Sequence, residues 1–229
     1  MAFFKHMTDK VAGKGIRMVF PEANDARVLG AAARLKADNL MEPILLGNRA
    51  EVEALAQEMG INNLDEMTLI DLDEYPAEGF EAMVQAFVEC RNGRNTEEQG
   101  REMLKDVNYF GTMLVQMDLA EGLVSGVVHS TGDTVRPALQ IIKTRPGVSR
   151  TSGAFVMIPE DPEDQMLLFA DCAINISPSA QELAEITESS IETAEVFGID
   201  PKVAMLSFST KGSGGNTPEV KKMVEATRL

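Results

Sequence analysis

Short apolar runs alternate with amphipathic segments along most of this 229-residue chain, and that order allows few folds. A short apolar run suits a buried strand, whereas apolar residues three or four apart suit a helix that buries one face. The first half predicts strands at residues 16–20, 43–46 and 67–70 and helices at residues 25–37, 51–59 and 81–90. Strands separated by helices form parallel sheets covered on both faces, so we expect a doubly wound α/β fold.

The same alternation continues in the second half of the chain. It predicts a helix near 109–117, a strand beginning at residue 123, a helix around 136, strands near 154–158 and 166–170, a capped helix from 179 to 198, and a strand at 202–208. The turn-forming stretch 144–147, Thr-Arg-Pro-Gly, is the best domain boundary, with the loop 159–162 as second choice. We therefore expect two mainly parallel α/β domains, residues 1–145 and 146–229.

The chain is strongly acidic, with a formal net charge of -15, but one segment departs from this pattern. Residues 121–150 carry four Lys or Arg against two Asp or Glu, whereas residues 151–200 carry eleven Asp or Glu and no Lys or Arg. Nucleic-acid binding depends on many cationic side chains that neutralise phosphates, so we expect no nucleic-acid partner. A small anion held in one basic pocket remains compatible with this charge distribution.

Composition also argues against a membrane protein and a metal site. No run approaches the roughly 20 apolar residues of a membrane span, and the first ten residues lack a signal-peptide pattern, so we expect a cytoplasmic protein. The only cysteines and histidines are Cys90, Cys172, His6 and His129, and their spacing is not that of metal ligands. We expect neither a metal nor a disulfide framework.

The basic segment contains a strand, a polar turn and a helix in that order, which suits a phosphate site. Residues 123–128 predict a buried apolar strand, and Ser130 and Thr131 precede apolar residues at helical spacing. The first N–H groups of a helix lack partners and attract an anion. Arg136 is expected in the first turn, leaning back over the loop because side chains tilt toward the helix start. The alternative is that the hydroxyl pair merely caps the helix.

Ligands of open α/β sheets bind at the carboxyl ends of the strands, where we expect the loops 130–133, 171–175 and 209–216 to share one cleft. Two residues beside these loops have two interpretations each. His129 either donates a proton or is a structural hydrogen-bonding residue, and the structural interpretation is favoured. Cys172 either carries an acyl group or is a small buried residue, and the second interpretation is again favoured.

Three strings in the second half carry a family resemblance: HSTGDTVRPALQIIKTRPGVSRTSG, FADCAIN and VAMLSFSTKGS. With the opening IRMVFPEANDARVLGAAARL and the string NYFGTMLVQMDLAEGLVSG, they make nearly the whole chain similar to the phosphate acetyl/butyryltransferase family. The resemblance implies a cytoplasmic homodimer of two α/β domains with the active site in the cleft between them. It also implies reversible acetyl transfer between coenzyme A and phosphate, with acetyl phosphate as the other substrate and no cofactor beyond coenzyme A itself.

The resemblance assigns roles to several residues of this sequence. Arg136, Ser130 and Thr131 are expected to hold the phosphate group during catalysis. Further substrate contacts are expected from Arg91, Ser149, Arg150, Thr151 and, as a weaker candidate, Lys211. The expected reaction is a direct attack of the coenzyme A thiolate on acetyl phosphate rather than transfer through a cysteine.

Three features depart from the family pattern. Glu121 and Gly132 stand where we expect Asp and Ala, and neither change is expected to alter the class of reaction. The family usually continues for roughly a third more chain beyond Leu229, so we expect an incomplete second domain. The general base that deprotonates coenzyme A is expected in that further part. The alternative function is a non-catalytic regulatory module of the same fold that binds an acyl phosphate or phosphate.

Overall fold

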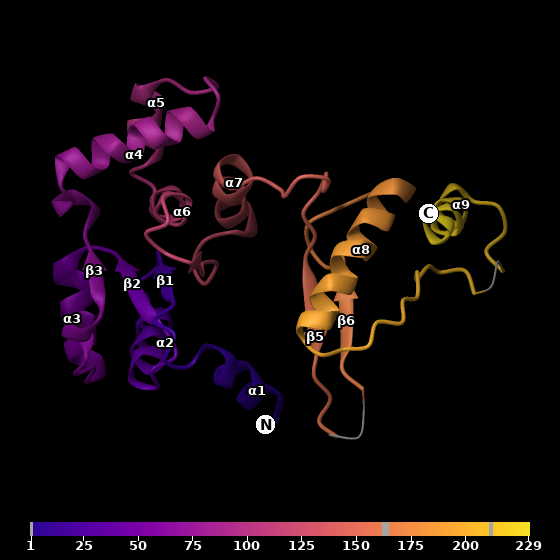
Figure 1. Ribbon diagram of the computed structural model, residues 1–229, viewed down its shortest axis with the longest axis horizontal. Helices are drawn as coiled ribbons and strands as arrows, with labels where there is room; N and C mark the ends of the chain where they lie inside the picture. The colour runs from indigo at the N-terminus through magenta and orange to yellow at the C-terminus, as the bar shows by residue number, and fades with distance from the viewer. Residues whose placement is uncertain (1, 162–164, 211–212) are drawn as a thin grey trace. The chain divides into compact units, whose positions relative to one another are not determined.

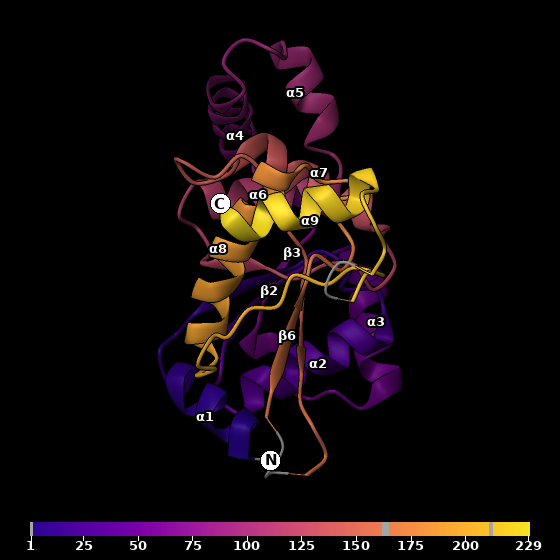
Figure 2. The same ribbon diagram turned by 90° about the vertical axis from the view of Figure 1, so that its right-hand side faces the viewer.

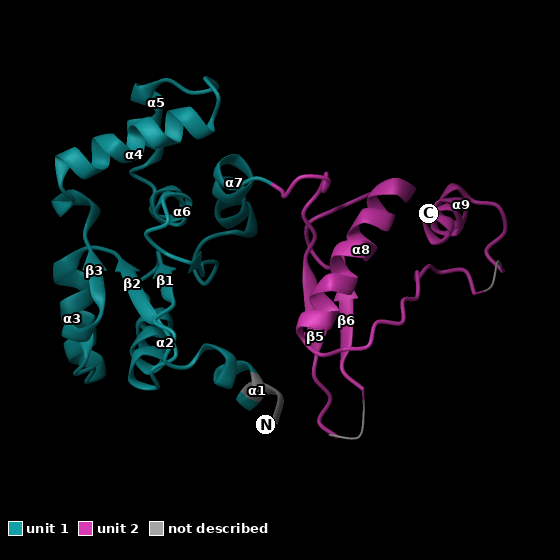
Figure 3. Ribbon diagram, viewed as in Figure 1, with its two compact units in different colours: residues 1–143 teal, residues 144–229 magenta. Residues whose placement is uncertain are grey.

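The computed structural model describes residues 2–161, 165–210 and 213–229 and divides the chain into two compact units (Figure 3). Unit 1 comprises residues 1–143 and unit 2 comprises residues 144–229. The division falls after Lys143, whereas the sequence predicts it after Arg145. Each unit has its own strands and helices and is described here by itself.

Unit 1 is built around a four-stranded parallel sheet, in the order β3-β2-β1-β4; Figure 1 labels β3, β2 and β1. The strands are β1 (Arg17–Phe20), β2 (Glu42–Leu46), β3 (Thr68–Ile70) and β4 (Gly122–Leu123). In the register of this sheet, Val19 lies opposite both Ile44 and Leu123. The predicted α/β class and the parallel sheet of the first domain are confirmed.

Helices cover both faces of this sheet because neighbouring strand residues point to opposite sides. Phe20 and Leu45 pack in one core with α2 (Ala26–Ala37) and α3 (Arg49–Met59). Val19 and Leu46 pack in a second core with α4 (Ala77–Cys90) and α6 (Val107–Gln116). The remaining helical elements of unit 1 are α1 (Ala2–Val11), α5 (Glu97–Met103), α7 (Thr131–Ile141) and the short η1 (Leu64–Glu66) and η2 (Leu72–Glu74). The unit is therefore doubly wound.

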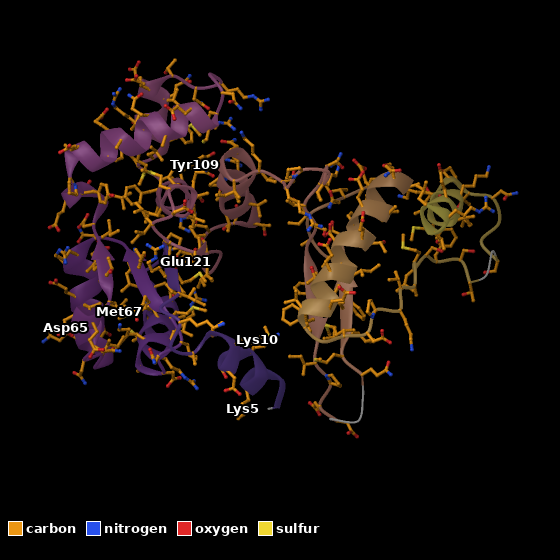
Figure 4. The ribbon with its side chains drawn as sticks, in the orientation of Figure 1. Lys5, Lys10, Asp65, Met67, Tyr109 and Glu121 are labelled. Carbon is orange, nitrogen blue, oxygen red and sulfur yellow. The ribbon has the colours of Figure 1, made fainter. Side chains whose placement is uncertain are left out.

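An ion pair joins the starts of β1 and β4, which are far apart in sequence. The carboxylate of Glu121, labelled in Figure 4, accepts hydrogen bonds from the backbone N of Arg17 at 2.6 Å and from its Nε at 3.1 Å. The side-chain hydrogen bond to Arg17 is the main cause that lowers the pKa of Glu121 to about 2. The glutamate that stands in place of the expected aspartate thus aligns two strands.

Unit 2 contains two strands and two helices in its described residues. Strand β5 (Ala154–Met157) pairs with β6 (Leu167–Ala170), so that Phe155 lies opposite Phe169. Helix α8 (Ala180–Val196) packs against β6, and α9 (Pro218–Arg228) packs against α8 (Figure 2). The predicted capping box of α8 is present, because Ser179 and Glu182 each accept a hydrogen bond from the other's backbone N–H.

Two expectations for unit 2 are wrong. The β5–β6 pair is antiparallel rather than parallel. The segment that joins these strands is too short for a crossover helix, which parallel neighbours need. Residues 202–208, expected as a buried strand, form no strand, and Val203, Leu206 and Phe208 are exposed. An apolar run forms a buried strand only where a neighbouring strand accepts its hydrogen bonds, and no such pairing occurs in the described residues of unit 2.

Gly111 of α6 lies where the helix touches the sheet, and it provides a test of this packing. A Cβ added there would lie 2.7 Å from Cδ1 of Leu123 and 3.0 Å from Cγ1 of Val19. Because such overpacking forces the core apart, Gly111→Ala is expected to lower the free energy of unfolding by about 1–3 kcal/mol in urea denaturation.

Gly30→Ala in α2 is the matched control. Its added Cβ would meet only the flexible Cε of Met59, at 3.2 Å. Because alanine favours a helix over glycine, this variant is expected to be neutral or up to about 1 kcal/mol more stable. A Gly111→Ala variant as stable as Gly30→Ala would contradict the close approach of α6 to the sheet.

Candidate functional site

The loop that leads from β4 to α7 wraps around the carboxylate of Glu22, which follows β1. Oε2 of Glu22 accepts hydrogen bonds from the backbone N of Gly126 at 3.1 Å and of Val127 at 2.9 Å. Oε1 accepts from the backbone N of Val128 and of His129, both at 2.8 Å. The side chain is almost fully buried, with 1% of its residue surface exposed. Four consecutive N–H groups thus enclose one carboxylate.

This loop corrects the prediction of a buried strand over residues 123–128. Strand β4 ends at Leu123, and Val124 makes the last backbone hydrogen bond to β1, with its N donating to Val19 O at 2.9 Å. Beyond that point the N–H groups point at Glu22 instead of a neighbouring strand. The side chains of Val127 and Val128 are consequently exposed, by 43% and 63%. Apolar composition alone cannot reveal a loop held by an anion from another part of the chain.

The imidazole of His129 completes the surroundings of Glu22. Its Nδ1 lies 2.7 Å from Oε1 of Glu22. Burial raises the pKa of Glu22, but the backbone hydrogen bonds from the loop, with the contribution of the His129 side chain, outweigh burial and lower the pKa to about 2. Glu22 is therefore ionised at neutral pH, and the N–H donors of the loop stabilise its charge.

Helix α7 begins directly after this loop. Ser130 is the N-cap residue, as the sequence allows, and its Oγ accepts a hydrogen bond from the backbone N of Asp133 at 3.2 Å. The same Oγ donates to Oδ2 of Asp133 at 2.6 Å. Thr131 is exposed, and within the described residues neither its N–H nor that of Gly132 has an acceptor. Two N–H groups at the positive end of the helix dipole are thus available to an anion.

Arg136 leans back over the start of α7. Because α7 begins at Thr131, Arg136 lies in the second turn and not in the first turn, as the sequence suggests. The guanidinium nevertheless reaches the first turn, since its Nη2 lies 3.8 Å from where a Cβ of Gly132 would be. In the described part of the chain, this guanidinium forms no hydrogen bond or ion pair. It influences Asp133, whose pKa is lowered first by the hydrogen bond from Ser130 and, against the effect of burial, further by Arg136.

Arg91 approaches the same helix from the end of α4. Its Nη1 donates to the carbonyl oxygen of Gln140 at 3.1 Å, and its Nε donates to Oδ1 of Asn95 at 2.9 Å. Tyr109 of α6, labelled in Figure 4, donates from Oη to Oε1 of Gln140 at 2.9 Å. Burial raises the pKa of Tyr109, while Arg136 and Arg91 act in the opposite direction. The two arginines and the phenol therefore lie close enough to influence one another.

The sequence analysis missed Glu22 and Tyr109. A single glutamate after a strand carries no signal of a loop more than a hundred residues later in the chain. The signal for Tyr109 is weak but present, because a phenol on an otherwise apolar helix needs a hydrogen-bond partner when it is buried. The structure thus brings four of the expected site residues into unit 1: Arg91, Ser130, Thr131 and Arg136.

The remaining expected contacts belong to unit 2. Ser149 donates from its backbone N to Oε2 of Glu185 at 3.3 Å and also through its hydroxyl. Arg150 forms an ion pair with Glu182, in the first turn of α8. The carbonyl oxygen of Thr151 accepts a hydrogen bond from the side chain of Asn175 at 2.9 Å. Lys211 lies outside the described residues.

Asp171 organises the loop 171–175 in much the same way as Glu22 organises its own loop. Its Oδ1 accepts hydrogen bonds from the backbone N of Gly153 at 2.9 Å and of Ala173 and Ile174 at 3.2 Å. Burial raises the pKa of Asp171, but these hydrogen bonds outweigh burial and hold the pKa well below its usual range. The neighbouring Cys172 is partly buried, and its Sγ donates to Phe169 O at 3.0 Å.

The chemistry of the unit 1 site suits an anion. The described residues contain no cluster of three or more His, Cys, Asp or Glu side chains that could hold a metal ion. Nor is any helix in the described ranges both long and apolar enough to cross a membrane. What α7 offers is two backbone donors, the hydroxyl of Thr131, and the guanidinium of Arg136, which has no competing partner among the described residues. This combination binds phosphate groups in many proteins.

Comparison with known proteins identifies relatives along the whole chain. The model of the family described as phosphate acetyl/butaryl transferase matches residues 2–229. The phosphate acetyltransferase of Bacillus subtilis strain 168 is 51% identical over 226 residues, which are 99% of this chain and 68% of that protein. The phosphate acetyltransferase of Staphylococcus aureus strain MRSA252 is 52% identical over 223 residues, 97% of this chain and 66% of that protein.

A solved structure gives the same result. The crystal structure of a phosphotransacetylase from Streptococcus pyogenes superposes with a TM-score of 0.91 at 56% identity. The alignment covers 99% of this chain and 68% of that one. This chain therefore spans about two thirds of the length of the relatives it matches.

Replacing the buried carboxylate tests whether Glu22 holds the loop. Glu22→Gln removes the charge and puts an N–H group among N–H donors. The pKa difference between the ordinary 4.5 and about 2 corresponds to about 3 kcal/mol, so we expect a loss of that size in the free energy of unfolding at pH 7. Denaturant titration by circular dichroism measures it.

The pH dependence of this loss has a definite sign. Because the pKa of Glu22 is lower in the folded state, its contribution is complete above pH 4.5 and disappears as the pH falls toward about 2. The stability difference between the unsubstituted chain and Glu22→Gln should therefore narrow over that range. Glu58→Gln, at an exposed glutamate, is the control and should stay within about 0.5 kcal/mol. A constant difference from pH 7 to pH 3 would contradict the role of the Glu22 charge.

Proposed function

This chain belongs to the phosphate acetyl/butaryl transferase family, and from that premise we propose that it moves an acetyl group between coenzyme A and inorganic phosphate. The reaction is acetyl-CoA plus phosphate to acetyl phosphate plus coenzyme A, and it is reversible. The observation that carries the proposal is the arrangement at the start of α7, where, within the described part of the chain, Arg136 has no ion-pair partner and leans over two unpaired backbone N–H groups. A phosphate group supplies the missing acceptor for all three.

The residues at the start of α7 have complementary roles in this proposal. The N–H groups of Thr131 and Gly132 donate to phosphate oxygens, and the hydroxyl of Thr131 is free to do the same. Ser130 fixes the helix start through its two hydrogen bonds with Asp133. Asp133 carries an opposing charge in the first turn of α7, but it is held by Ser130 and forms no ion pair with Arg136. The guanidinium is thereby left to neutralise the incoming anion.

These groups also act on the chemical step. In the direct reaction, the thiolate sulfur of coenzyme A attacks the carbonyl carbon of acetyl phosphate, and the phosphate leaves when the C–O bond of the tetrahedral adduct breaks. Negative charge grows on the phosphate oxygens as that bond breaks. Donors and a cation aimed at those oxygens lower the barrier, because they bind the departing phosphate better than the bound ester. Arg136 and the donors of Thr131 and Gly132 have this role, Ser130 contributes by fixing the helix start, and Arg91 adds positive charge beside them.

Direct attack is preferred over an acyl-enzyme on Cys172. The thiol of Cys172 donates to a backbone carbonyl, and in the described residues no basic side chain contacts it. A cysteine nucleophile needs a base or a cationic partner to form a thiolate at neutral pH. The substrate contacts from Ser149, Arg150, Thr151 and Lys211, the homodimer and the cytoplasmic location remain proposals based on the family resemblance.

Substitution of Arg136 tests the proposed anion site. Arg136→Gln removes the charge while keeping a polar side chain, so the dissociation constant for acetyl phosphate is expected to rise about 10- to 100-fold, the usual value of a charge-assisted hydrogen bond. Isothermal titration calorimetry measures it. Arg34→Gln on α2, at an exposed arginine outside the site, is the control and should bind as the unsubstituted chain does.

Three further outcomes separate the alternatives. Unchanged affinity in Arg136→Gln would contradict the assignment of the site. Acetyl phosphate binding without any turnover of coenzyme A would instead favour the regulatory module. If the chain turns over, Cys172→Ala should keep its activity, and complete loss in that variant would point to an acyl-enzyme.

A further inference from the structure

His129 is a titratable side chain at the start of α7 that the proposed function does not use. It immediately precedes the N-cap residue Ser130, and its side chain is 30% exposed. Both its backbone N and its Nδ1 contact Oε1 of Glu22, at 2.8 Å and 2.7 Å. The ring is thus fixed on one side by a buried carboxylate.

The contact with Glu22 determines which ring nitrogen carries the proton. Glu22 is ionised, so it can only accept, and Nδ1 must be the donor. In the neutral ring, Nε2 then has a lone pair, and in the protonated ring it carries a second N–H. Nε2 has no hydrogen-bond partner in the described residues. A carboxylate that fixes one ring nitrogen and leaves the other available is the usual arrangement of a proton-transferring histidine.

His129 and Arg136 lie at the same helix start, because His129 immediately precedes the N-cap residue Ser130 and the guanidinium of Arg136 reaches the first turn. Both residues are among the groups that lower the pKa of Asp133, after the hydrogen bond from Ser130.

Acetyl transfer from acetyl phosphate to coenzyme A requires a proton on the departing phosphate. If the C–O bond of acetyl phosphate breaks without proton transfer, phosphate leaves as a trianion, which is a strong base and a poor leaving group. If a proton reaches the bridging oxygen as the bond breaks, phosphate leaves as a dianion. The thiol of coenzyme A gives up one proton in the same reaction, so the overall equation balances when one proton passes from sulfur to phosphate.

We propose that His129, oriented by Glu22, donates the proton from Nε2 to the bridging oxygen of acetyl phosphate as the C–O bond breaks. In the reverse direction, neutral Nε2 takes the proton from the attacking phosphate. The imidazole regains its proton from solvent, which has received the proton of the coenzyme A thiol. This inference rests on the proposed function, and it makes His129 a catalytic residue and Glu22 the residue that positions it.

His129→Asn tests the inference with little disturbance of the loop. The asparagine amide can donate to Glu22 in place of Nδ1, but it has no counterpart of Nε2. In the full chain, kcat for acetyl phosphate and coenzyme A is expected to fall about 100-fold, the lower end of general acid catalysis, while the KM for acetyl phosphate changes less than about threefold. His6→Asn replaces the chain's other histidine as control and should keep its kcat. A His129→Asn variant that keeps kcat within about threefold would overturn the inference.

A second substrate distinguishes proton donation from a structural role. Acetyl methyl phosphate releases methyl phosphate as a dianion, which is a much weaker base than the phosphate trianion and needs no proton to leave. The defect of His129→Asn should therefore shrink to less than about tenfold with this substrate. A structural defect would be the same for both substrates, and that result would also overturn the inference.

Phosphate binding measured by NMR, which needs no turnover, tests the role of His129 separately from the proposed transferase activity. The chain has two histidines, so proton NMR with His6→Asn assigns the Cε1–H signal of His129. Inorganic phosphate should shift this signal saturably in the unsubstituted chain and leave the signal of His6 unchanged. An inactive chain whose His129 signal responds to phosphate would refute the transferase function of this chain while supporting the contact. A silent His129 signal at saturating phosphate would overturn the inference in an active chain or an inactive one.

Discussion

The candidate site depends on the hydrogen bonds between the buried carboxylate of Glu22 and the loop that precedes α7. A charge taken out of water must be surrounded by donors, and here the donors are four consecutive N–H groups of the loop between β4 and α7. Because those N–H groups must point inward, the loop has one conformation. That conformation sets where His129 and Ser130 lie, and Ser130 sets where α7 begins. The position of Arg136 over the helix start follows from that beginning.

Electrostatics then distinguishes this helix start from the rest of an acidic chain. In the described residues, seven arginines form ion pairs with carboxylates: Arg17, Arg27, Arg34, Arg49, Arg101, Arg145 and Arg150. Arg136 forms none there, although Asp133 is nearby, because Ser130 holds that carboxylate. Other arginines of this part of the chain also lack a carboxylate partner, so what distinguishes Arg136 is its position over two unpaired backbone N–H groups at a helix start, which suits an external anion.

Local sequence patterns predicted the helices, strands and helix caps that depend on interactions between residues close in sequence. The helical periodicity of residues 25–37 and 51–59 and the apolar runs near 16–20 and 43–46 were sufficient for the doubly wound sheet of unit 1. The helix caps at Ser130 and Ser179 also follow from sequence, because each depends on residues within one turn. The wrong predictions concern contacts between residues far apart in sequence. Residues 124–129 form a loop instead of the expected strand because the N–H groups of residues 126–129 bind Glu22, which lies about a hundred positions earlier in the chain. The strand expected over 202–208 has no neighbour that continues a sheet.

The central claim is that the start of α7 is a phosphate site whose backbone donors are arranged by the loop around Glu22. Amide NMR spectra of the full chain, recorded while inorganic phosphate is added, test it most directly. The account predicts that the backbone N–H signals of Thr131 and Gly132 show the largest shifts and saturate together, since these two groups have no acceptor in the described structure. Saturable shifts confined to other parts of the chain, with Thr131 and Gly132 unchanged, would contradict it.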